Sequence, residues 1–256
     1  MRREFLVAAM MAWCGQALAF GRMADVQVID QTTGSTLQVY EHRGRHYIAG
    51  EPGHEYAVSV TNREGGRLMA VGSVDGVNIV SGDTAAVDQN GYVLAPWQNF
   101  VIDGWRTSMQ TTAAFYFTTV ADSYAARTGR PDELGVIGFA LFREKSQPAP
   151  CCSWWDRRAK QESDAAASEA PAPAAKAEAQ GSARAPREDR IGTGYGRSET
   201  SQVAYTDFEP ASKSPNEMIT LYYDSYQNLC KKGVIRTTPP RSHDPQPFPG
   251  HFVPAP

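Results

Sequence analysis

The segment Glu55-Tyr56-Ala57-Val58-Ser59-Val60-Thr61-Asn62 has the alternating pattern of a β-strand with one buried face. Tyr56, Val58 and Val60 fall on one face, while polar residues such as Ser59 fall on the other, because successive side chains of a strand point to opposite sides. The hydrophobic period is therefore two residues, and the segment predicts a half-buried strand.

Short β-type runs with the same character recur from about residue 25 to residue 145. We expect the further strands at 26–30, 37–41, 46–49, 68–75, 77–80, 92–95, 100–102, 113–120 and 136–143. Glycine-containing turns such as Asp75-Gly76 and Asn90-Gly91 separate these runs, and no crossover helix fits between them. The pattern predicts a mainly β fold, an antiparallel two-sheet sandwich of jelly-roll-like type over residues 20–150.

The composition changes after this block. Residues 156–190 contain no Val, Ile, Leu, Phe, Tyr or Trp, which predicts a disordered Ala/Pro-rich linker. The glycines of 192–196 are interpreted as a flexible joint. Alternation around Val203, Tyr205 and Asp207 and a β run at 218–223 then predict a hairpin.

A short helix is expected after this hairpin, capped by Asp224 or Ser225 and ended at Gly233. Residues 197–236 would form one unit that docks on the sandwich. Seven prolines in residues 237–256 predict an extended Pro-rich tail.

The amino-terminal residues are typical of an export signal. Arg2 and Arg3 precede an apolar run at 5–13, and Ala17-Leu18-Ala19 offers a peptidase site, so residues 1–19 are expected to be cleaved. The paired arginines also resemble a twin-arginine signal, although an ordinary secretion signal is favoured. The mature chain is expected to be periplasmic or secreted, without a transmembrane segment.

The charge balance gives no reason to expect a nucleic-acid partner. The chain has a net charge of -3, whereas proteins that bind a phosphate backbone usually carry a basic surplus. Three cysteines would remain after cleavage, and in an oxidising compartment Cys230 is expected to form a disulfide with Cys151 or Cys152. A catalytic thiol is disfavoured, because no histidine lies near these cysteines in sequence.

Histidines offer one metal-like constellation. His42 and His46 flank a tight turn, and His54 follows one strand later, so the three could converge on a metal ion. The two arginines in the same turn favour a solvated hairpin tip instead. Acidic residues around Asp75 and Asp83 are of the type that binds calcium, but their spacing matches no EF-hand and hairpin turn chemistry explains them.

Aromatic residues near turns are the best candidates for ligand contacts. Tyr92, Trp97, Trp105 and Tyr124 lie in or beside turns of the predicted sandwich, where flat rings can stack on sugar or peptide. Packing in the core is the competing interpretation for each ring.

Several segments resemble an uncharacterised group of bacterial exported proteins. These are Ser73-Val74-Asp75-Gly76-Val77-Asn78, Gly91-Tyr92-Val93-Leu94, Gly104-Trp105-Arg106, Phe115-Tyr116-Phe117, Gly135-Val136-Ile137-Gly138, Gly192-Thr193-Gly194 and Tyr222-Tyr223-Asp224-Ser225-Tyr226. The resemblance covers both ordered parts and implies one architecture, and it carries no activity.

No serine-nucleophile or phosphate-loop motif occurs in the chain. We therefore expect a non-enzymatic exported protein without a cofactor, acting by binding or assembly at the cell envelope, with an unknown protein or glycan as partner. A carbohydrate-binding β-sandwich module is the first alternative. A metal-dependent enzyme using the three histidines is the second.

Limited proteolysis tests the predicted organisation. Because residues 156–190 lack large apolar side chains, the first cuts should fall there and leave 25–145 intact. The fragments can be identified by mass spectrometry over a time course. Faster cleavage inside 25–145 would contradict the domain map.

Overall fold

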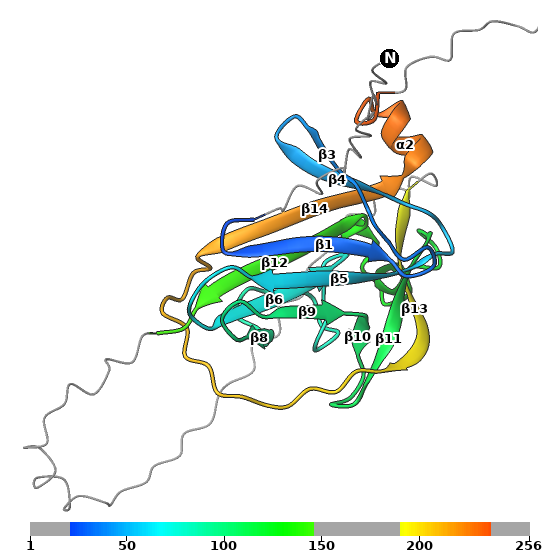
Figure 1. The fold of residues 1–256 in the computed structure, drawn as a ribbon. Coiled ribbons are helices and arrows are strands. Elements are labelled where there is room, and N and C mark those ends of the chain that lie inside the picture. The colour runs from blue at the N-terminus through cyan, green and yellow to red at the C-terminus, as the bar shows by residue number, and fades with distance from the viewer. Residues whose placement is uncertain (1–20, 146–189, 237–256) are drawn as a thin grey trace, which may run out of the picture.

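The computed structural model describes residues 21–145 and 190–236, which form two β-sheets packed face to face (Figure 1). The prediction of a mainly β, two-sheet sandwich is confirmed. Within the described ranges, no helix is long and apolar enough to cross a membrane. The predicted leader, most of the linker and the Pro-rich tail lie outside the described residues.

The first sheet has the strand order β10-β11-β5-β1-β2, with β13 on the other edge of β11 and β9 beside β5. Its strands are β1 (Ala24–Asp30), β2 (Ser35–Thr36), β5 (Glu55–Asn62), β9 (Asn99–Ile102), β10 (Gly104–Arg106), β11 (Thr111–Thr119) and β13 (Ile191–Thr200).

The second sheet has the order β3-β4-β14-β12-β6-β7, with β8 beside β6. Its strands are β3 (Val39–His42), β4 (Arg45–Gly50), β6 (Leu68–Val74), β7 (Val77–Asn78), β8 (Tyr92–Leu94), β12 (Val136–Arg143) and β14 (Glu217–Ser225). Neighbours pair antiparallel except β4 and β14, which are parallel.

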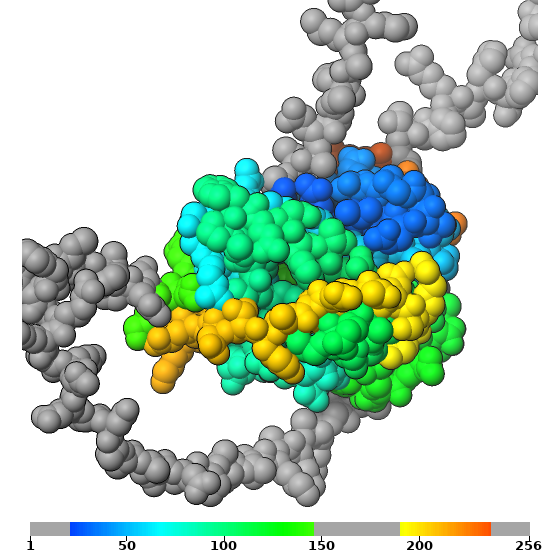
Figure 2. All heavy atoms as spheres, turned by 60° about the horizontal axis from the view of Figure 1, so that its bottom comes forward, coloured from blue at the N-terminus to red at the C-terminus, as the bar shows by residue number. Residues whose placement is uncertain are grey.

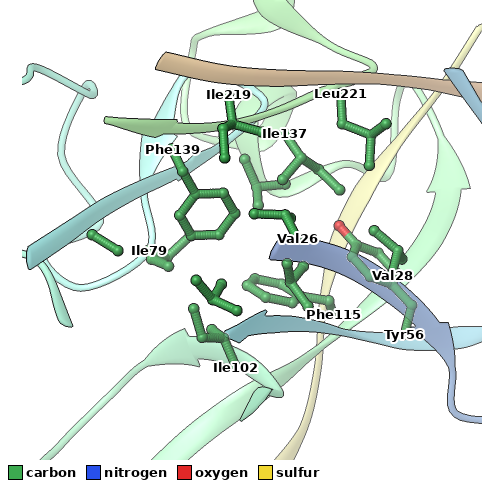
Figure 3. Close-up of a cluster of buried hydrophobic side chains, with 14 of the residues drawn as sticks. Val26, Val28, Tyr56, Ile79, Ile102, Phe115, Ile137, Phe139, Ile219 and Leu221 are labelled. Carbon is green, nitrogen blue, oxygen red and sulfur yellow. The ribbon is translucent and has the colours of Figure 1, made fainter. Parts of the chain in front are cut away.

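The core lies between the sheets and follows from the period-two pattern. Tyr56 and Phe115 of the first sheet face Ile137 and Phe139 of the second, and all four side chains are buried (Figure 3). Strands β5 and β12 have the bounds that the sequence predicts.

The C-terminal part supplies strands and a short helix, but the predicted hairpin does not form. Residues 201–209 contain no strand, and the first C-terminal strand is β13, which begins at Ile191, twelve residues before Val203, and belongs to the first sheet. Strand β14 lies between β4 and β12 in the second sheet. Residues 190–236 therefore complete both sheets instead of docking as a separate unit on a sandwich confined to 20–150.

The glycines interpreted as a flexible joint are part of strand β13. A Cβ atom at Gly194 would lie 2.1 Å from the ring of Tyr116 on the neighbouring strand. Close approach of the Tyr116 ring, rather than flexibility, thus explains this glycine.

Residues 201–216 cross the surface as an extended strap between β13 and β14 (Figure 2, yellow to orange). Phe208 of the strap packs on the small cluster formed by Val71, Ala140 and Phe142 on the outer face of the second sheet. Strand β12 is therefore covered on both faces.

Helix α2 (Tyr226–Lys231) confirms the predicted C-terminal helix. The Ser225 side chain accepts a hydrogen bond from the Asn228 amide, and Gly233 follows with φ of 71°. A second helix, α1 (Tyr124–Arg127), and a short 3-10 turn, η1 (Pro131–Glu133), connect β11 to β12.

Candidate ligand-binding site

Two of the aromatic residues proposed as ligand contacts belong to the core. Trp105 is 3% exposed, and its indole nitrogen donates to the Gly194 carbonyl at 3.0 Å. Tyr92 is 9% exposed, and its hydroxyl accepts from Arg106 at 3.1 Å. The prediction that Tyr92 and Trp105 contact a ligand is therefore wrong, because both rings point into the core from their strands. Tyr124 is half-buried and packs against Trp105 at a ring separation of 4.8 Å.

Trp97 is the member of the predicted set that is exposed, at 68%. It lies in a tight turn in which the Gln98 amide donates to the Ala95 carbonyl at 3.2 Å. Its φ of 60° places it in the left-handed region, which bulky residues rarely adopt. With Pro96 before it, Trp97 occupies the turn position that normally requires glycine.

The Trp97 turn is held by the buried side chain of Asn62 at the end of β5. The Asn62 amide nitrogen donates to the Ala95 carbonyl at 2.9 Å and to the Gly66 carbonyl at 2.8 Å. The backbone amide of Asn62 donates to the Gln98 carbonyl at 2.8 Å. Hydrogen bonds from Asn62 thus fix the backbone that carries the exposed indole.

A hollow of about 620 Å³ lies where the segment after β5 meets the end of β12. It is lined by Glu64, Gly65, Gly66, Arg67, Arg143, Glu144 and Lys145. Its walls carry ion pairs between Arg143 and Glu64 at 2.5 Å and between Arg67 and Glu144 at 2.6 Å. The Arg143 hydrogen bond lowers the pKa of Glu64. The hydrogen bond from Asn62 to Gly66 joins the wall of the hollow to the Trp97 turn.

The three histidines do not converge, so the predicted metal cluster is wrong. In the β3–β4 register His42 lies opposite Arg45 and His46 lies opposite Glu41, which puts the two imidazoles on different sides of the hairpin. His54 instead contacts Asp30, with Nδ1 2.7 Å from Oδ2. Residues 21–145 and 190–236 contain no group of three potential metal ligands.

The His54–Asp30 pair is a local structural contact at the end of β1. Burial acts to raise the pKa of Asp30, but hydrogen bonds from His54 and from the Thr33 and Thr32 amides outweigh it and lower the pKa. The carboxylate is therefore held ionised beside the ring.

A buried polar network that the sequence did not reveal links the two sheets. Asp75, in the turn between β6 and β7, is fully buried, and its carboxylate accepts hydrogen bonds from the amides of Gly135 at 2.8 Å and Thr193 at 2.7 Å. The Tyr223 hydroxyl donates to the same carboxylate at 2.7 Å. Turn chemistry explained Asp75-Gly76 in the sequence, and both residues do have positive φ, but the carboxylate is taken up by protein donors.

Three hydroxyls form a chain that ends on Asp75. Because Tyr223 donates to Asp75, the Thr193 hydroxyl must donate to Tyr223 at 2.7 Å, and Tyr56 must donate to Thr193 at 2.6 Å. Burial, the largest influence, raises the pKa of Asp75 to about 6 despite these donors.

The predicted disulfide stays a prediction. Cys230 lies on α2 and is bonded to no cysteine of the described ranges. Its two expected partners, Cys151 and Cys152, lie outside those ranges.

Searches of protein-family models, curated proteins and solved structures gave no match to this chain.

Replacing Tyr223 by Phe should lower the free energy of unfolding by about 1–3 kcal/mol, because Thr193 loses its acceptor and Asp75 loses a donor. Asp75→Asn should cost more, about 3 kcal/mol or above, since an amide NH₂ would face a backbone N–H. Chemical denaturation measures both. Tyr205→Phe is the matched control, because Tyr205 is 92% exposed. Equal effects at Tyr223 and Tyr205 would contradict the network.

The pH dependence of stability should report Asp75. Its pKa of about 6 in the folded protein exceeds the ordinary value of 3.8, so the proton binds the folded state more tightly and stability falls as pH rises through 6. Going from pH 8 to pH 5, this residue should add about 1.4 kcal/mol to the free energy of unfolding. Carbon-13 NMR of the Asp75 carboxyl should show a midpoint near pH 6, and a midpoint near 4 would refute the assignment.

Proposed function

We propose that this protein is a non-enzymatic exported binding protein of the cell envelope and that Trp97 is a primary contact with its ligand. The supporting observation is the Trp97 turn, which presents a large exposed ring on a fixed backbone. The proposed location rests on the leader-like residues 1–19.

The free-energy cost of the Trp97 turn favours a role for Trp97 in ligand binding over a role in stability. A bulky residue held at positive φ costs roughly 1–3 kcal/mol, and glycine would avoid that cost. A ring that is 68% exposed recovers little of it through packing. Strained residues of this kind concentrate at functional sites, and exposed tryptophans are frequent anchors in binding interfaces.

The charged lining of the hollow favours a polar ligand. Its volume of about 620 Å³ is in the range of small-ligand sites, and planar charged groups of Arg67, Arg143 and Glu64 line it. An exposed tryptophan ring suits the apolar face of a sugar, and charged groups on the wall that Asn62 connects to its turn suit the sugar hydroxyls. A carbohydrate-binding module is therefore the second candidate, with Trp97 as the exposed ring of the predicted aromatic set.

Trp97→Gly separates binding from folding. Glycine relieves the positive φ, so the melting temperature should stay constant or rise, while retention of the purified protein on isolated envelopes should fall about tenfold. Trp97→Phe should keep part of the retention, and Tyr205→Ala, which removes an exposed ring elsewhere, should keep all of it. Destabilisation of Trp97→Gly by about 3 kcal/mol would instead identify Trp97 as a packing residue.

A further inference from the structure

Three tyrosines lie side by side across three neighbouring strands of the second sheet. Tyr40 of β3 is paired with Tyr47 of β4, and Tyr47 is paired with Tyr222 of β14. Paired residues of adjacent strands project to the same side of a sheet, so the three rings share one face. We call Tyr40, Tyr47 and Tyr222 the tyrosine face.

The tyrosine face points away from the core. Ile48, Leu221 and Tyr223, which alternate with Tyr47 and Tyr222 along the strands, are buried between the sheets. The three tyrosines themselves are only partly buried. In Figure 1 the β3–β4 hairpin lies on the opposite side of the molecule from β8 and β9, so this face is separate from the Trp97 turn.

Two of the three rings contact each other, and an arginine lies over one of them. The Tyr47 and Tyr222 ring centroids are 5.5 Å apart, and the Arg45 guanidinium lies 5.3 Å from the Tyr222 ring centroid. Tyr226 of α2 is 46% exposed, and the nearby phenol of Tyr40 contributes to raising its pKa, after the larger influence of Cys230. Helix α2 thus extends the aromatic surface.

The hairpin tip beside the tyrosine face is basic. His42 and Arg45 are paired in the register and lie on the same side as the tyrosines, whereas Glu41 lies on the other side. Arg43 occupies the turn with φ of 51°, where Asn, Asp or Gly is normally found. This local positive charge contrasts with the net charge of -3 of the whole chain.

We propose that the tyrosine face and its basic tip bind an acidic polysaccharide. Flat phenol rings can stack on the apolar faces of pyranose rings, while the Arg43 and Arg45 guanidinium groups pair with sugar carboxylates. Charge complementarity selects an anionic polymer over a neutral one. Arg43, like Trp97, is an exposed side chain at a turn position with positive φ, where a smaller residue would avoid the strain. This site is independent of the Trp97 turn.

Affinity electrophoresis with polygalacturonate tests the proposal, with neutral dextran as the comparison polymer. The wild-type protein should be retarded by polygalacturonate alone, and the retardation should weaken as salt is added. Arg43→Asn should weaken binding about tenfold with no loss of thermal stability, because Asn tolerates the positive φ. Tyr226→Ala should also weaken it. Arg127→Gln, which removes an exposed charge on α1, and Tyr205→Ala are controls that should bind normally.

Several results would overturn the proposal. Equal retardation by dextran, or binding unchanged in an Arg43→Asn, Arg45→Gln double variant, would remove the role of charge. Equally tight binding of oligothymidylate would make the face a general polyanion surface. A dimer in sedimentation analysis that dissociates in the Tyr226→Ala variant would assign the face to a second copy of the chain. Absence of any polygalacturonate binding would reject it outright.

Discussion

The two sheets are joined at one end by a single buried carboxylate. Asp75 leaves β6 in a left-handed conformation and accepts hydrogen bonds from donors at the start of β12, in β13 and in β14. A buried charge is tolerated only when its acceptor capacity is used, so these donors must be in place together. Strands separated by a long stretch of sequence are thereby fixed relative to each other, and β13 and β14, both from residues 190–236, each supply one of the donors.

Asp75, Arg43 and Trp97 are the non-glycine residues of the described ranges with positive φ, and they divide into two kinds. At Asp75 the positive φ goes with a buried carboxylate that accepts hydrogen bonds from Gly135, Thr193 and Tyr223. At Arg43 and Trp97 the side chains are exposed, and the fold gains little from either. Strain that is not offset by packing is most simply understood as serving contacts with other molecules.

The surface has two candidate binding areas with different chemistry. The Trp97 turn combines one indole with a nearby wall of ion pairs, whereas the tyrosine face combines several phenols with Arg43 and Arg45 at the hairpin tip. The strap of residues 201–216 covers the apolar patch around Phe142, so the outer side of the second sheet is divided into a covered half and an aromatic half.

The sequence by itself determined the features that depend on neighbours along the chain. Strands β5 and β12 are defined by their period of two, and helix α2 by Ser225 at its start and Gly233 after its end. Only the tertiary structure decided which turn aromatics are buried, the role of Asp75, and the alignment of the tyrosine face. These depend on pairings between distant segments, such as β4 with β14, and the energy of such contacts is absent from local sequence patterns.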